Sequence, residues 1–384
     1  MTRIGAGLST SASAAAAGVE AARQARGDLT GERVDLAFVF LSQPHLAHVA
    51  DAAEAVSEEL SPRHLLGCVA QGVVGRDTEL EEGPGVAVWA ASLPGAQIET
   101  FHAYAEVADE GVEIAGFPEL GDPSLVALLV DPFTFPAGRL LESLNEDHPG
   151  LPLVGGIAVG GGRPGAQALI AGTEVHEEGA VGAVVSGIPV RTVVSQGCAP
   201  IGRDSVITQA DGNVVFELAG RPALERLRDE IGSLPDDRQA LAARGLLAGL
   251  VIDENKPEYG RGDFLVRGLL GADEETGALA IGEELRVGQT LRFHVRDAES
   301  ADADLREALG ETLAAGHPAG ALLFTCNGRG ANMFPEPSHD ARLVAEVLGH
   351  QGLAGFFCGG EIGPVGGRAF LHGFTATMAV FLDV

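Results

Sequence analysis

Apolar residues recur along the chain as short continuous runs, each followed by a longer segment in which apolar and polar positions alternate with helical spacing. Runs of five or six apolar residues between turn signals are typical of buried strands, and the 3.6-residue spacing indicates an amphipathic helix. Strands are predicted at residues 36–41, 125–130 and 321–325, and helices at 46–60, 139–145 and 341–348. Ser338 and Gly349 suit the start and the end of the last helix. The pattern predicts the same strand–loop–helix unit three times.

A second strand and a glycine-rich turn follow each predicted helix. In the first unit the sequence LLGCVAQG starts at residue 65, and in the third LAGFFCGG starts at residue 353. Glycines occur at 67, 72, 75 and 85 in the one and, with the same spacing, at 355, 360, 363 and 373 in the other. A third copy, LVGGIAVG, starts at residue 153. The shared spacing and the shared preceding elements indicate internal duplication.

A stretch of different character separates the second and third units. Asp211 and Gly212 lie between two strand-like segments and are a strong hairpin signal. Helices are predicted from 221–222, from near 235 and over 302–315, and strands at 188–196, 264–270 and 291–295. We predict an α/β protein (α+β is the alternative) of two similar domains, each with mixed β-sheets flanked by helices. The domains are expected at 1–190, with repeat units at about 31–95 and 120–187, and at 191–384.

Charge and composition exclude several classes of function. The formal net charge is −29, so the surface repels nucleic-acid backbones and anionic membranes. Lys256 is the only lysine, and no phosphate-binding loop precedes it. The four cysteines form no CxxC motif, and no run approaches the ~20 apolar residues of a membrane helix. We expect a cytoplasmic protein without a cofactor or metal site.

Polar side chains gather where the two parallel strands of the third unit are predicted to end. Ligands bind at this edge in sheets of this kind. Arginine offers a fork for a carboxylate and glutamate accepts from an ammonium group, so the set suits a small zwitterion. The candidate ligand-binding residues are Cys326, Asn327, Gly328, Arg329, Gly330, Gly360, Glu361, Gly363, Arg368 and His372. In the alternative interpretation the glycines serve only tight turns, and arginine and glutamate form a mutual salt bridge.

Cys326 supports a second alternative, a thiol-dependent enzyme or a redox-active protein. A thiol near an arginine and backbone N–H groups can be reactive. The corresponding positions of the first and second units carry Ser42 and Asp131, however, so the repeat does not preserve a nucleophile. We assign no catalytic residue and favour a non-enzymatic function. The acidic run at 79–82 is interpreted as a solvated turn.

Three groups of motifs resemble the FIST family, named for F-box and intracellular signal transduction. FTCNGRG from residue 324, GFFCGGEIGPVGG from 355 and LHGFT from 371 are similar to its C-terminal domain. QGCAPIG from 196 and ELAGRPA from 217 are similar to the segment that joins its two domains, and residues 67–75 and 153–161 to its N-terminal domain. The resemblance covers nearly the whole chain.

The resemblance implies a sensory, signal-transducing module that binds small ligands such as amino acids. In that family the module is often joined to an output domain, which the two FIST-like domains of this chain leave no room for. The expected partners are therefore a small-molecule ligand and a separate signalling protein, with a pure interaction scaffold as the remaining alternative.

Overall fold

A computed structural model describes residues 1–384 except 109–110, 261, 350–351 and 384. The chain divides into two compact units. The first comprises Met1–Ser195, Leu305–Leu371 and Thr375–Val384, and the second comprises Gln196–Asp304 and His372–Phe374. The second unit is thus almost wholly an insertion into the first.

Three copies of one supersecondary motif build the first unit: a strand, a helix, a strand parallel to the first, a hairpin and a closing antiparallel strand. The first copy is β2 (Leu36–Ser42), η1 (Gln43–His48), α2 (Val49–Leu60), β3 (His64–Ala70), β4 (Val73–Gly75), β5 (Thr78–Leu80) and β6 (Val86–Ser92). The second is β9 (Leu125–Val130), α3 (Ala137–Asp147), β10 (Leu153–Ile157), β11 (Leu169–Ala171), β12 (Glu174–His176) and β13 (Ala180–Ser186). The third is β22 (His317–Cys326), η2 (Gly330–Asn332), α7 (His339–Leu348), β23 (Leu353–Cys358), β24 (Glu361–Val365), β25 (Arg368–His372) and β26 (Thr375–Asp383). The predicted mixed α/β fold with internal repeats is confirmed.

Each copy is preceded by a strand that pairs beside its closing strand. These are β1 (Arg3–Ser9), β7 (Gln97–Ala108), which forms a ribbon with β8 (Gly111–Ala115), and β14 (Val190–Gln196). In two copies a helix lies between this strand and the first strand of the copy. Helix α1 (Ala14–Asp28) lies between β1 and β2, and helix α6 (Ala298–Ala315) comes directly before β22. The insertion, residues 196–304, thus begins at the last residue of β14 and ends within α6.

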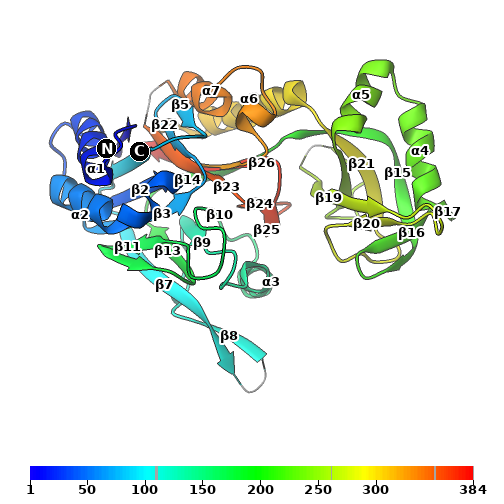
Figure 1. The fold of residues 1–384 in the computed structure, drawn as a ribbon, viewed down its shortest axis with the longest axis horizontal. Coiled ribbons are helices and arrows are strands. Elements are labelled where there is room, and N and C mark those ends of the chain that lie inside the picture. The colour runs from blue at the N-terminus through cyan, green and yellow to red at the C-terminus, as the bar shows by residue number, and fades with distance from the viewer. Residues whose placement is uncertain (109–110, 261, 350–351, 384) are drawn as a thin grey trace. The chain divides into compact units, whose positions relative to one another are not determined.

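The three hairpins are exchanged between the copies (Figure 1). Hairpin β4–β5 of the first copy pairs with β23 of the third, β24–β25 of the third with β10 of the second, and β11–β12 of the second with β3 of the first. The exchange closes on itself, so each of the three sheets contains strands of two copies. No single copy has a complete sheet of its own.

Equivalent glycines align the three copies residue by residue. A Cβ atom at Gly67, Gly155 or Gly355 would overlap the carbonyl oxygen of the neighbouring first strand, so only glycine fits there. Those carbonyl groups belong to Val39, Leu128 and Leu323. Counting along the paired strands from these contacts shows which positions correspond at the site. Ser42 and Cys326, the last residues of β2 and β22, correspond to Asp131, which directly follows β9. The hairpins begin with Val73, Leu169 and Glu361.

The inner faces of the three sheets share one apolar core. Its aromatic members come from the first and third copies, and the ring centroids of Trp89 and Phe381 lie 4.9 Å apart and those of Phe40 and Phe356 5.3 Å apart. Helices α1 and α2, α3, and α6 with α7 cover the outer faces of the three sheets. The core of the first unit therefore requires residues from both ends of the chain.

The second unit is a largely antiparallel sheet with two helices. Its strands run in the order β15 (Cys198–Asp211), β21 (Thr290–Arg296), β18 (Leu246–Val251), β19 (Phe264–Ala272), β20 (Leu279–Ile281), β16 (Val214–Leu218) and β17 (Arg221–Pro222). β15 also pairs with β16, so the first strand of this order is hydrogen-bonded to the sixth. The helices are α4 (Ala223–Gly232) and α5 (Asp236–Arg244). Among the described residues of the whole chain, no helix is long and apolar enough to cross a membrane.

Candidate functional site

The two loops predicted to carry the site leave the same edge of the third sheet. β22 and β23 are parallel, and their last residues, Cys326 and Cys358, are register partners. The backbone N–H of Asn327 donates to the carbonyl oxygen of Cys358 over 2.9 Å, which continues the pairing into the loop. The loop at 327–330 and the start of β24 at Glu361 therefore lie beside each other, as the parallel arrangement predicts.

Arg329 is fully buried and bound to an aspartate that the sequence did not indicate. Its Nε donates to Oδ2 of Asp340 over 2.7 Å and its Nη2 donates to Oδ1 over 2.8 Å. The guanidinium also lies over the ring of Phe334, at 5.2 Å from the centroid. The geometry is the bidentate one that gives arginine–carboxylate pairs their strength. The alternative interpretation had this arginine in a salt bridge to a glutamate, but its salt-bridge partner is Asp340.

Asp340 lies in the first turn of α7 and is itself fully buried. Thr325 Oγ1 donates to its Oδ2 over 3.0 Å, and Nδ1 of His339 lies 3.0 Å from its Oδ1. Burial opposes ionisation of this carboxyl group, but the charge and the hydrogen bonds of Arg329 outweigh burial and hold the pKa of Asp340 well below its usual range. The charge of Arg329 is thus matched within the protein.

Glu361 is the second buried acid of the site. Its Oε2 accepts from the backbone N–H of Thr375 over 3.1 Å and from the Thr375 hydroxyl over 2.9 Å, and its side chain is hydrogen-bonded to Cys326. Burial raises the pKa of Glu361 to about 8 despite these bonds. The equivalent residues of the other copies, Val73 and Leu169, are apolar. The third copy alone carries an acid at this core position.

Glu79 is a third acid of the site, and the prediction that residues 79–82 form a solvated turn is wrong for it. It lies in β5, the hairpin strand that the first copy contributes to the third sheet. Its Oε1 accepts from the N–H of Ala341 over 2.9 Å, and its own N–H donates to Ser338 Oγ over 3.0 Å. Burial and the nearby Asp340 raise the pKa of Glu79 to about 8. The sequence could not indicate the burial of Glu79, because this burial depends on the pairing of hairpin β4–β5 of the first copy with β23 of the third.

Several buried polar atoms of this cluster lack a hydrogen-bond partner among the described residues. They are Oε2 of Glu79, Oδ1 of Asn327, Nη1 of Arg329 and Oε1 of Glu361. Buried polar groups of native proteins are nearly always hydrogen-bonded, to protein or to ordered water. The cluster therefore offers donors and acceptors for a further polar molecule.

The other predicted residues do not all join this cluster. The N–H of Gly328 donates to Cys326 Sγ over 3.3 Å, and Gly330, at φ +52°, lies against Glu81. Gly360 accepts from Ile157. Three residues lie elsewhere: Gly363 packs against Val194 and Thr377, Arg368 is exposed over the ring of Phe370, and His372 belongs to the second unit.

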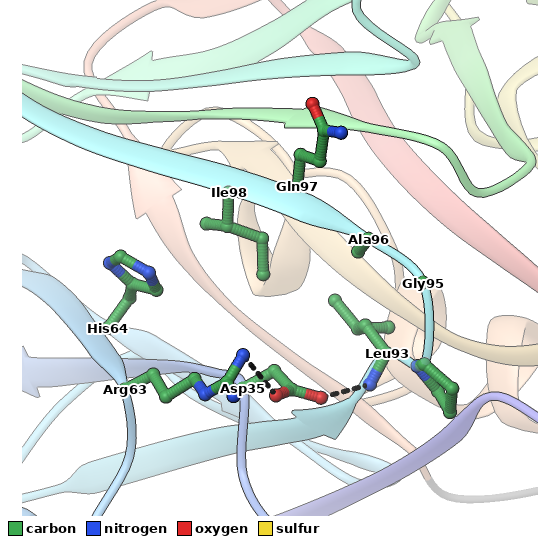
Figure 2. A pocket seen from close by; sticks show the side chains of 9 residues that line it. Asp35, Arg63, His64, Leu93, Gly95, Ala96, Gln97 and Ile98 are labelled. Carbon is green, nitrogen blue, oxygen red and sulfur yellow. Dashed lines mark hydrogen bonds and ion pairs between the residues drawn. The ribbon is translucent and has the colours of Figure 1, made fainter.

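A separate cavity of about 510 Å³ lies in the first copy, where β2 and β3 begin and β6 ends. It lies beside the turn at residues 93–98 (Figure 2). Asp35 lies between Arg63, with Oδ1 3.6 Å from Nη1, and the N–H of Leu93, which donates to Oδ2 over 2.8 Å. Burial lowers the pKa of His64, and its Nδ1 lies 3.3 Å from the Thr100 hydroxyl. Each of these side chains has a partner. The Arg329 cluster, with its unmatched buried atoms, is the stronger candidate.

Within the described chain, no group of three or more His, Cys, Asp or Glu residues is arranged to hold a metal ion.

Replacing Glu361 with glutamine should change how stability depends on pH. Between the ordinary pKa of 4.5 and about 8, the unfolded chain loses this proton while the folded protein keeps it. The contribution of Glu361 to the free energy of unfolding therefore falls by about 1.4 kcal/mol per pH unit over that range and is constant above it. Glutamine does not titrate, so Glu361→Gln should gain stability relative to the wild type at that rate from about pH 5 to 8. Urea unfolding at several pH values measures this; Glu82→Gln, at an exposed position, is the control. Parallel curves for Glu361→Gln and wild type would contradict the assignment.

Comparison with known proteins agrees with this architecture. The FIST N domain model matches residues 35–221 and the FIST C domain model matches residues 223–364. An uncharacterized protein of Mycobacterium tuberculosis is 48% identical over 384 residues, covering 99% of this chain and 100% of the relative. An uncharacterized protein of Mycobacterium bovis is 46% identical, covering 99% of each chain. The chain belongs to the FIST family, whose domains are associated with sensing in signal transduction.

Proposed function

We propose that this protein is a sensory module that binds a small amphoteric molecule, an amino acid or a small carboxylate, at the Arg329 cluster and passes the signal to a separate signalling protein. The observation that carries the proposal is the set of unmatched polar atoms on Asn327, Arg329 and Glu361. Leaving a buried donor or acceptor unpaired costs about 1–3 kcal/mol, so a molecule that pairs several of them is bound favourably.

The chemistry of these atoms defines the ligand. Arg329 Nη1 is a donor and matches a carboxylate oxygen, whereas Asn327 Oδ1 is an acceptor and matches an ammonium or hydroxyl group. A compact molecule with one anionic and one donor group satisfies the set, which favours an amino acid over a purely apolar or a polyanionic ligand.

Hairpin β4–β5 is the element that closes the site in this proposal. Besides the bonds of Glu79 to Ser338 and Ala341, Oε1 of Glu81 accepts from the N–H of Ala331 over 2.8 Å. These bonds hold the hairpin of the first copy across the loop and the helix of the third. The ligand enters when these hydrogen bonds open. Their arrangement around the bound ligand passes the signal to the rest of the third sheet.

A thermal-shift screen with L-alanine, L-glutamate, acetate and pyruvate tests the proposal. At a concentration of about 100 times Kd, a ligand adds about 2.7 kcal/mol of stability and raises the melting temperature. Asn327→Leu removes the acceptor and should abolish the shift, while Arg368→Ala, at an exposed position, should leave it unchanged. The proposal fails if no compound of these classes raises the melting temperature, or if Asn327→Leu responds like the wild type.

A further inference from the structure

The ribbon formed by β7 and β8 extends from the rest of the first unit, and one of its edges is open (Figure 1). The two strands pair from Tyr104 with Ala115 to Ala108 with Gly111. β8 is the last strand of its sheet, so in the described part of the chain no strand pairs with its outer edge. The first three residues of β8 are exposed and the last two are half-buried. Such an edge presents unpaired N–H and C=O groups that can bind a further strand.

A cavity of about 470 Å³ adjoins this open edge. Val112 and Ile114 line it from β8, and Leu140 and Leu144 line it from α3. Val107, the register partner of Val112, lies on the same face of the ribbon and is 93% exposed. An open edge beside a cavity with apolar walls suits an extended peptide, because its main chain is hydrogen-bonded to the edge while alternate side chains enter the cavity.

The opposite face of the ribbon is acidic. Glu106 of β7 and Glu113 of β8 are register partners, and both are exposed. Like charges directly opposite each other destabilise a pair of strands. Glu119 and Asp147 outnumber Arg139 among the acidic and arginine side chains that line the cavity. A basic residue on an added strand beside Glu113 would relieve the repulsion between the two glutamates, so the charges favour a basic partner.

We propose that β8 is the docking edge for an extended segment of another protein in which basic and apolar residues alternate. The segment pairs with Gly111–Ala115 as a further strand of the sheet. One basic residue lies beside Glu113, and the apolar residues on either side of it lie beside Val112 and Ile114, next to the cavity. That this partner receives the signal of the sensor rests on the proposed function, whereas docking itself does not require the Arg329 cluster.

A second copy of this chain is a poor occupant of the same edge. Two β8 strands paired about their middle residue would place Glu113 beside Glu113, next to the existing pair with Glu106. Each chain also carries a formal net charge of −29, which opposes association of like copies. The acidic face therefore selects against the strand itself and for a segment of opposite charge.

Fluorescence anisotropy of the full-length protein with a labelled synthetic peptide of alternating lysine and valine tests the proposal. The control peptide has the same residues arranged as a run of lysines followed by a run of valines, so its charge and composition are identical. The alternating peptide should bind about tenfold more tightly or better, because only it places lysine beside Glu113 and valine beside both neighbours. Hydrogen exchange should show the backbone amides of residues 111–115 protected in the complex.

Two matched variants locate the binding edge. Glu113→Lys turns an attractive cross-strand contact with the peptide into a repulsive one, so the affinity should fall by about tenfold. Position 113 is exposed, so the variant should unfold like the wild type. Glu174→Lys makes the same charge change at an exposed position of β12, another strand at the end of its sheet. This control should bind the alternating peptide like the wild type.

Equal affinity of the wild type for the two peptides would overturn the proposal, and this comparison depends on no variant. Binding without protection of the β8 amides would place the peptide elsewhere, and a dimer that Glu113→Lys disrupts would make a second copy the occupant. If the alternating peptide binds but no small molecule raises the melting temperature, docking stands and the proposed function fails. If a small molecule stabilises the protein but the peptide does not bind, the proposed function stands without this inference.

Discussion

Replacing Arg329 with methionine is expected to lower the free energy of unfolding of the first unit by about 3–5 kcal/mol, because it leaves a buried carboxylate without its cation. Asp340 would keep only the Thr325 hydroxyl and the His339 ring as partners. The sole tryptophan, Trp89, lies in the core of the first unit, so its fluorescence during urea unfolding measures this effect.

The matching double variant separates a broken ion pair from a lost packing contact. Arg329→Met combined with Asp340→Leu removes both charges, and apolar replacement of a whole buried pair is often neutral or stabilising. The double variant should therefore recover most of the loss. Arg368→Met, an exposed arginine that also lies over a phenylalanine ring, should change the free energy of unfolding by less than about 0.5 kcal/mol. A loss below about 1 kcal/mol in Arg329→Met would show that the Asp340 charge is not carried in the folded state.

A chain that ends at Ser195 is expected not to fold cooperatively, whereas one that lacks only the insertion is expected to fold. The shorter chain loses Phe324, Phe356 and Phe381 from the shared core, and each buried phenylalanine contributes about 1.5–3 kcal/mol. It also loses β23, the partner of hairpin β4–β5. Since whole-protein stability is typically only about 5–15 kcal/mol, the remaining residues should not sustain the fold.

Deleting residues 197–303 and joining the ends with a short glycine linker preserves all three copies. The ends of the insertion already meet, because the N–H of Gln196 donates to Asp304 Oδ2 over 2.6 Å. Trp89 emission and the unfolding transition of this variant should resemble those of the wild type, and residues 1–195 alone should show exposed tryptophan and no transition. Cooperative unfolding of residues 1–195 alone would contradict the shared core.

Local pattern was sufficient to predict the repeated unit but not the exchange of hairpins. The run at 125–130, the helical spacing at 139–145 and the glycines at 67 and 355 depend on neighbours in sequence, and each appears where predicted. Strands β4 and β11 have three residues each, too few for their pattern to reveal a partner. Their pairing depends on how the copies meet, which is a property of the whole core.

The same distinction applies to the site. Arg329 and Glu361 were predicted together because parallel strands bring their ends to one edge. Asp340 was not, because a carboxylate in the first turn of a helix is ordinary in sequence and only its burial makes it a partner. Glu79 was assigned to a turn because an acidic run is usually solvated. The sequence could thus indicate Arg329 and Glu361 but not Asp340, which balances the charge of the arginine, or Glu79.

The position of the insertion in the chain determines the order in which the parts of the two units are synthesised. A ribosome releases residues 196–304 before any residue of the third copy, so the second unit has most of its strands available while the first still lacks β22 to β26. Until the last part of the chain emerges, β10 and hairpin β4–β5 have unpaired edges, and Phe40 and Trp89 of the first copy lack their aromatic partners Phe356 and Phe381. Nascent chains arrested between about residues 200 and 300 should therefore depend on chaperones, although much of their sequence belongs to a stable core.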